Sequence, residues 1–169
     1  MLLTGTSRRF LRSHRAFTLV EIMVVVAIIG LLAAAALPTY RHITLRSKAT
    51  AIVTDLRAFS GVFLNYNLTK GAWPASAQPG VIPPEVADAI QSAFGKPTAI
   101  GGYYEWDNAN SSNGFYVTAA ITLTSANGSS LTDDLDLLLM IDSMMDDGNP
   151  NTGSVRISAT NNLVYIIEQ

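Results

Sequence analysis

The chain has no cysteine and only two histidines among its 169 residues. The missing cysteines exclude disulfides and thiolate metal sites. The two histidines, His14 and His42, cannot be assembled into a Ser-His-Asp or Cys-His set, and the sequence holds no glycine-rich phosphate loop. These absences predict a protein that is not an enzyme, in which His42 is a solvated residue.

Basic charge is scarce beyond the N-terminus. Arg8, Arg9, Arg12 and Arg15 lie in the first 16 positions and have no acidic neighbours there. The rest of the chain is therefore acidic, with a net charge of about −6 that follows from its composition. An acidic body argues against nucleic acid as a partner.

The N-terminal part of the chain contains a long stretch without charge, residues 22–40. Phe17 to Leu37 would measure roughly 31 Å as a helix, which matches a hydrocarbon core of about 30 Å. One carboxylate, Glu21, lies near the start of this segment, and a carboxylate inside lipid costs roughly 2.5–3.5 kcal/mol. We therefore expect Glu21 to have a partner that offsets this cost.

Several kinds of N-terminal segment combine a basic start with an apolar stretch. A secretory signal peptide has an apolar stretch of about 7–15 residues followed by small residues at a cut site, and the alanines at 33–36 resemble such a site. An ordinary signal anchor has the right length but no use for Glu21. A further interpretation rests on a family resemblance and accounts for Glu21 as well.

The residues that carry this resemblance are 16–21, AFTLVE, with arginines before them and Gly30 and Pro38 after them. They resemble the class III signal of type IV pilins and type II secretion pseudopilins. In that family the cut falls before the phenylalanine and the apolar helix is retained; Ala16 stands where the family usually has glycine. The resemblance implies cleavage between Ala16 and Phe17 by a prepilin peptidase, followed by methylation of the new N-terminus.

The resemblance also implies a function, that of a structural subunit of a type IV pilus-like filament. Such a subunit polymerises with other pilin-like subunits through its apolar helix, in which Glu21 pairs with the Phe17 amine of a neighbour. The chain would cross the bacterial inner membrane once, with its C-terminal domain outside the cytoplasm, in a periplasmic or surface filament.

Two questions stay open at this point. The lack of cysteines removes the C-terminal disulfide loop of many pilus pilins, and with the acidic loop described below it favours a type II secretion pseudopilin over a pilin. The alternative from another class is a membrane-anchored periplasmic binding module that does not polymerise.

The N-terminal helix is predicted to continue past Pro38 to about Tyr66. Apolar residues recur there at three- and four-residue steps, which is the pattern of an amphipathic helix with one buried stripe. Pro38 removes one backbone hydrogen bond and Gly30 adds weakness, so we expect a kink. The predicted stripe is Leu45, Ala49, Ile52, Val53, Leu56, Phe59, Phe63 and Tyr66.

Beyond this helix, glycine, proline and asparagine residues recur at short intervals, which predicts short helices and strands separated by turns. The predicted helices cover residues 84–94 and 133–145, the second capped by Thr132 and packed through Leu135, Leu138, Leu139 and Asp142. The predicted strands cover residues 103–106, 115–123 (half-buried), 154–158 and 163–167, with turns at 108–114, 127–128 and 161–162.

Together these elements predict an α+β protein with a pilin-like fold: a long N-terminal helix, apolar in its first half, packed on a small antiparallel sheet. The expected parts are a basic leader peptide at 1–16, a transmembrane or filament-core half of the helix at 17–40, and a periplasmic pilin-like domain at 41–169.

An acidic stretch, residues 142–153, is a candidate metal-binding loop. Hard cations need several oxygen ligands from a tight loop. Asp147, Asn149 and Asn151 alternate as in the first half of a calcium loop, whereas the second half lacks that loop's glycine and bidentate glutamate. The stretch is either a polar turn or a calcium site. The candidate ligands are Asp142, Asp146, Asp147, Asn149 and Asn151.

Overall fold

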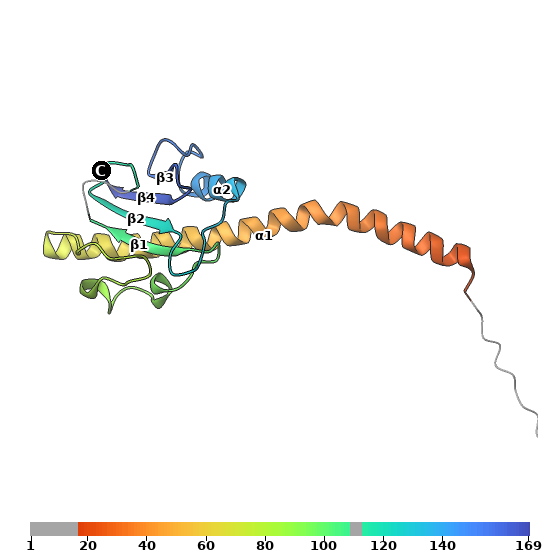
Figure 1. Cartoon of the computed structure of the whole chain (residues 1–169), viewed down its shortest axis with the longest axis horizontal. Coiled ribbons are helices and arrows are strands. Elements are labelled where there is room, and N and C mark those ends of the chain that lie inside the picture. The colour runs from red at the N-terminus through yellow and green to blue at the C-terminus, as the bar shows by residue number, and fades with distance from the viewer. Residues whose placement is uncertain (1–16, 109–112) are drawn as a thin grey trace, which may run out of the picture. The chain divides into compact units, whose positions relative to one another are not determined.

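The computed structural model describes residues 17–108 and 113–169 (Figure 1). The chain divides into two compact units, with the boundary between Arg41 and His42. The predicted leader, including Ala16 at the expected cut, and the middle of the turn predicted at 108–114 lie outside the described residues.

The first helix, α1, covers Leu19–Lys70, so it extends one turn further than the sequence predicts. It remains helical through Gly30 and Pro38. It ends at Gly71, whose positive φ of 73° closes the last turn while its N–H bonds the carbonyl of Asn67 at 2.7 Å.

The second half of α1 buries one face, as its periodicity predicts. The buried residues are Ala49, Ile52, Val53, Leu56, Phe59, Ser60 and Phe63. Leu45 and Tyr66, at the two ends of the predicted stripe, are only partly buried against the same core. This face forms one wall of the main hydrophobic core.

Opposite this face lies an antiparallel sheet. In the described part of the chain it has four strands in the order β1-β2-β4-β3. The strands are β1 (Tyr103–Asp107), β2 (Ala119–Thr124), β3 (Val155–Ile157) and β4 (Leu163–Glu168). Figure 1 shows β1 and β2 beside the second half of α1. The predicted α+β, pilin-like architecture is thus confirmed, and the terminal hairpin is β3 and β4, paired from Val155↔Tyr165 to Ile157↔Leu163.

Aromatic side chains join the helix to the first strand. Phe63 stacks on Trp106 with ring centroids 3.7 Å apart, and Phe59 meets Tyr104 edge-on at 5.0 Å. Trp106 and Tyr104 alternate with half-buried residues along β1, so both point to the helix. The Tyr104 hydroxyl donates a hydrogen bond of 3.0 Å to Asp55 of α1.

The prediction of a half-buried strand over residues 115–123 is wrong. β2 begins only at Ala119, with a bulge between Ala119 and Ala120, and five of its six residues are buried. Phe115 and Val117 instead belong to a second apolar cluster with Ala120, Val164 and Ile166. Both faces of the central strand are therefore covered, and a strand covered on both faces loses its contrast between polar and apolar sides.

The predicted helix over residues 84–94 is also wrong. Two 3₁₀ turns occupy this segment, Pro84–Val86 and Ser92–Gly95. A helix this short is marginal on its own, and tertiary packing decides its conformation. Here the side chains of Val86, Ile90 and Phe94 are anchored in the core.

The second helix, α2 (Leu135–Met145), starts two residues later than predicted and has a different cap. Asp134, not Thr132, accepts the N–H of Leu137, while the Thr132 hydroxyl accepts the N–H of Asp134. Two of the four residues predicted for the buried face, Leu138 and Asp142, are buried, and the prediction is confirmed for them. The other two are not: Leu135 is 51% exposed and Leu139 is half-buried, and Leu137 and Ile141 complete the buried face instead.

Candidate functional site

The first candidate site is the exposed apolar stretch at the start of α1. All residues from Phe17 to His42 are exposed, and each large apolar side chain in residues 17–37 exposes at least 47% of its surface. Among the described residues, α1 is the one helix long and apolar enough to cross a membrane. A helix that is apolar on all sides requires lipid or other helices around it.

Thr18 and Glu21 organise the N-terminus of α1. The N–H of Glu21 donates to the Thr18 hydroxyl oxygen at 3.2 Å, and a Glu21 carboxylate oxygen lies 3.5 Å from both the N–H nitrogen and the hydroxyl oxygen of Thr18. This reciprocal arrangement is a capping box, whose signal is Ser or Thr followed three residues later by Glu or Gln. Our sequence analysis missed Thr18, although the Thr-x-x-Glu spacing was visible.

The other predicted residues of this segment can be placed individually. The side chain of Phe17 is 76% exposed, and Glu21 is exposed as well. A Cβ atom added to Gly30 would meet no atom within 4 Å, and Pro38 lies inside the helix. The carboxylate of Glu21 is therefore accessible to a partner from another molecule.

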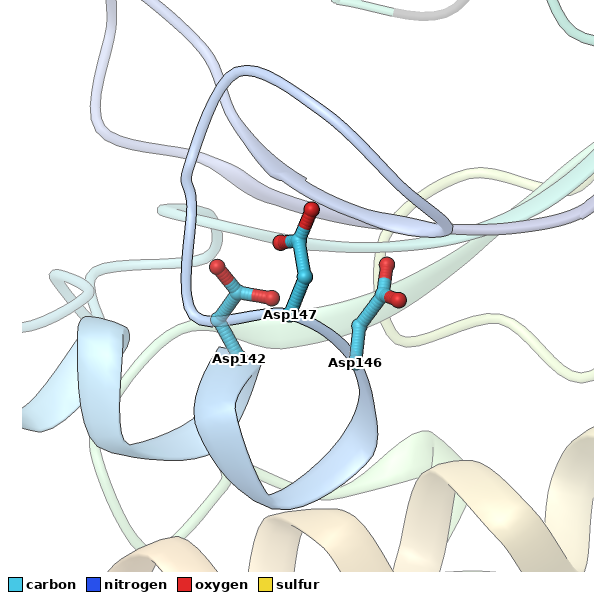
Figure 2. Close-up of side chains that lie close together, drawn as sticks. All are labelled: Asp142, Asp146 and Asp147. Atoms are coloured by element: carbon cyan, nitrogen blue, oxygen red, sulfur yellow. The ribbon is translucent and has the colours of Figure 1, made fainter.

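The second candidate site lies at the C-terminal end of α2. Carboxylate oxygens of Asp142, Asp146 and Asp147 all lie within 4.8 Å of one another. Figure 2 shows the three side chains projecting from the end of α2 toward the loop that follows it. The sequence analysis named all three, and the structure brings them together.

Asp142 is the buried member of this cluster. Its side chain is 0% exposed, and neither of its carboxylate oxygens has a hydrogen-bond partner. Burial raises the pKa of Asp142, and the charges of Asp147 and Asp146 raise it further. The backbone N–H of Gly148 lowers this pKa, although its contact with the carboxylate does not meet the geometry of a hydrogen bond. An unpaired carboxylate in such a place is costly, and it demands a proton or a cation.

Asp146 connects the end of α2 to the start of β3. Its Oδ2 atom accepts hydrogen bonds from the N–H and hydroxyl of Ser154 and from the N–H of Val155. Gly153 has a φ of 74°, and a Cβ atom there would overlap the Asp146 carboxylate. The backbone can therefore approach this carboxylate only because residue 153 is glycine.

Asp147 organises the loop itself. Its Oδ1 atom accepts the N–H of Asn149 at 2.8 Å, and its Oδ2 atom accepts the Thr152 hydroxyl at 2.7 Å. The Asn149 amide oxygen accepts the N–H of Asn151 at 3.2 Å in the same way. The Thr152 hydrogen bond, followed by that from Asn149, lowers the pKa of Asp147. The alternating polar residues thus form consecutive Asx turns.

Comparison with known proteins identifies the N-terminal segment. Residues 11–37 match the family described as the prokaryotic N-terminal methylation motif. The type IV major pilin protein PilE1 of Neisseria gonorrhoeae is 37% identical over 71 residues, which cover 42% of this chain and 33% of the pilin. No solved structure matches the chain.

Two further relatives extend this finding. The fimbrial protein EcpC of Eikenella corrodens is 43% identical over 62 residues, 37% of this chain and 40% of the relative. A fimbrial protein of Pseudomonas aeruginosa is 36% identical over 73 residues, 40% of this chain and 47% of the relative. The matches span less than half of each relative's length. The predicted resemblance to type IV pilins is confirmed.

Proposed function

We propose that this chain is a structural subunit of a type IV pilus-like filament and polymerises through the first part of α1. The observation that carries the proposal is the contrast between the two parts of this helix. Residues 17–42 are exposed on every side, whereas the later part is packed into a core. Only a membrane or neighbouring helices can cover so large an apolar surface in water.

Assembly begins with processing. A prepilin peptidase removes residues 1–16 and leaves Phe17 with a free, positively charged amine, which is then methylated. The match of residues 11–37 to the methylation motif supports this step. The apolar half of the helix, residues 17–40, anchors the mature subunit in the bacterial inner membrane, and residues 41–169 form the domain outside the cytoplasm.

Glu21 then selects the position of each new subunit. In a bundle of apolar helices its carboxylate pairs with the Phe17 amine of a neighbouring subunit. Leaving one partner of a buried ion pair without the other costs about 3–5 kcal/mol, so a register that pairs them is strongly preferred. The accessible carboxylate supports this role. Gly30 and Pro38 supply the place where the helix bends as the subunits pack.

The filament belongs either to a pilus or to a type II secretion system. The named relatives are pilus and fimbrial proteins, which supports a pilin. The absence of cysteine and the acidic loop after α2 support a pseudopilin, because many pilus pilins have a disulfide in their C-terminal part. Loss of the chain from the native bacterium distinguishes the two: a pilin mutant loses surface fibres, and a pseudopilin mutant retains exoproteins in the periplasm.

The experiment that tests the proposal separates polymer from monomer. Cells that carry the assembly machinery and express the tagged chain are sheared, and the released material is sedimented and imaged by electron microscopy. We expect fibres that contain the tag. Recovery of the whole population as detergent-soluble monomer from the membrane fraction would instead support the rival function, a membrane-anchored binding module that does not polymerise.

A further inference from the structure

We propose that a groove along α1, within residues 43–55, binds the phosphate headgroup of an anionic phospholipid through Arg46. The site rests on the proposed membrane anchor and goes beyond it, because it assigns a lipid ligand to the part of α1 that follows the apolar stretch. Lipid binding at this site requires no filament.

The groove lies on the exposed side of α1. Its volume is about 580 Å³, which is within the range of about 300–1,000 Å³ that is usual for small-molecule sites. Most of its surface is apolar, with Ile43 and Ala51 among the lining residues, and Arg46 supplies its positive charge. The groove can therefore accept a ligand that combines a charged group with apolar parts, as a phospholipid does.

Two polar side chains toward the N-terminal end of the groove are available to a ligand. Within the described ranges, no hydrogen bond or ion pair engages the guanidinium of Arg46 or the hydroxyl of Ser47. At the other end of the groove lies Asp55, whose carboxylate accepts the Tyr104 hydroxyl. An anion should therefore bind at the Arg46 end, where a guanidinium can donate two parallel hydrogen bonds to phosphate oxygens.

The neighbouring hydroxyls in the groove are already engaged. Thr50 donates to the carbonyl of Arg46 and Thr54 donates to the carbonyl of Thr50, each at 2.8 Å. These bonds leave the guanidinium itself free, because they involve only the main chain of Arg46. Arg46 is therefore the residue of the groove that decides its preference for an anion.

Arg46 also follows closely on the uncharged stretch. It is the sixth residue after Tyr40, the last residue of that stretch. Six helical residues span about 9 Å, and the polar headgroups add about 5–8 Å to each side of the hydrocarbon core. Because a long arginine side chain can extend toward the headgroups, its guanidinium can reach the phosphates of the membrane that anchors residues 17–40.

The distribution of charge along the chain fits an anionic surface near this part of α1. Residues 41–70 contain five basic residues and one acidic residue, a net charge of +4, whereas residues 71–169 contain two basic and eleven acidic residues, a net charge of −9. Basic residues that orient a membrane helix lie on its cytoplasmic side, and the four arginines within residues 8–15 supply them. The later cations are thus left to attract an anionic membrane, which repels the acidic remainder of the chain.

The test uses the full chain in vesicles that contain either phosphatidylglycerol or phosphatidylcholine with a photoreactive group near the phosphate. Peptide mass spectrometry separates labels on residues 43–55 from labels on residues 1–16. The anionic probe should label residues 43–55 at least fivefold more than the zwitterionic probe does. Arg46→Gln should lower this labelling about fivefold, the factor that corresponds to about 1 kcal/mol per basic residue near an anionic surface.

The matched control is Lys48→Gln, which removes the same charge from an exposed position on the opposite side of the helix. It should retain most of the labelling. An equal loss in both variants would indicate diffuse attraction and overturn the site, as would equal labelling by the two probes. Labelling that falls as the chain becomes more crowded in the vesicles would assign Arg46 to the acidic surface of a second copy and would also overturn it.

Flotation of the vesicles separates the lipid site from the proposed function. A chain that does not float with the vesicles contradicts the membrane anchor and the lipid site together. A chain that floats but is not labelled within residues 43–55 contradicts the lipid site alone. Neither result depends on filament formation.

Discussion

The N–H of Glu21 donates a hydrogen bond of 3.2 Å to the hydroxyl oxygen of Thr18, and the Glu21 carboxylate reaches back to the N–H of Thr18 at 3.5 Å. Glu21 thus has a local role at the start of α1 in addition to its proposed role between subunits. The two roles require different properties of the Glu21 side chain. Capping the helix requires only atoms that form hydrogen bonds, whereas pairing with the amine of a neighbouring Phe17 requires a negative charge.

Thr18→Ala should separate these roles. Loss of an N-cap side chain costs about 1 kcal/mol of helix stability, so the first turn of α1 should fray. The charge of Glu21 is unchanged, and we expect the filament yield to stay within about fivefold of the wild-type yield, because 1 kcal/mol changes an equilibrium by about that factor. Quantitative immunoblots of sheared filaments measure it. A loss of filaments as complete as that caused by removing the carboxylate would mean that the cap, not the charge, governs assembly.

Processing should remove residues 1–16. The intact mass of the membrane-extracted protein should correspond to a chain that begins at Phe17 and carries one methyl group. Ala16→Gly, which restores the residue usual in the family, should be cut at the same bond. A mature chain that begins at Met1, or one that begins after Ala36, would contradict the proposed processing.

The hydrogen bond between Tyr104 and Asp55 should stabilise the packing of β1 on α1. Tyr104→Phe retains the buried ring and leaves the Asp55 carboxylate without this donor at 3.0 Å. We expect a loss of about 1 kcal/mol in the free energy of unfolding, which lowers the melting temperature by about 2–4 °C. Tyr116→Phe, at a side chain that is 82% exposed, is the matched control and should have no effect.

Glu105 should make stability depend on pH. Burial, and then the charge of Asp107, raises the pKa of Glu105 from 4.5 to about 7 in the folded chain. The folded state therefore holds this proton more tightly than the unfolded state, and the contribution is present below pH 4.5 and lost as the pH rises to about 7. The free energy of unfolding, measured from pH 4.5 to about pH 7, should therefore decline as the pH rises.

Glu105→Gln should remove this part of the decline. At pH 8 it should stabilise the chain by about 1 kcal/mol, a figure reduced for the partial solvent exposure of the group. Asp88→Asn, an exposed control, should leave the pH profile as it is. Parallel profiles for the unchanged chain and Glu105→Gln would show that the Glu105 carboxyl is not perturbed by folding.

The parts of the fold predicted correctly are those with a local cause. The stripe on α1 follows from residues spaced along one helix, and the turn at Asn161, with a φ of 61°, follows from the residue types that tolerate that conformation. The two-sided burial of β2 could not be predicted, because it depends on the distant residues Val164 and Ile166.

The candidate sites likewise combine features that are visible in the local sequence with features that depend on distant residues. The acidic cluster was visible because Asp142, Asp146 and Asp147 are close in sequence. Asp142 was also correctly predicted to lie on the inner face of α2, but its complete burial depends on the packing of that helix in the folded chain. The contact of Asp146 with Ser154 depends on the fold of the intervening loop. Sequence proximity indicated the residues, and only packing defines their roles.

The central claim is that subunits polymerise through α1 with Glu21 as the charged partner of a neighbouring Phe17. The most direct test is the filament yield of Glu21→Gln, because glutamine retains the capping box while it removes the charge. We expect this variant to enter the membrane and to be cut as the unchanged chain is, yet to give at least tenfold fewer sheared filaments. A wild-type yield from Glu21→Gln would contradict the claim.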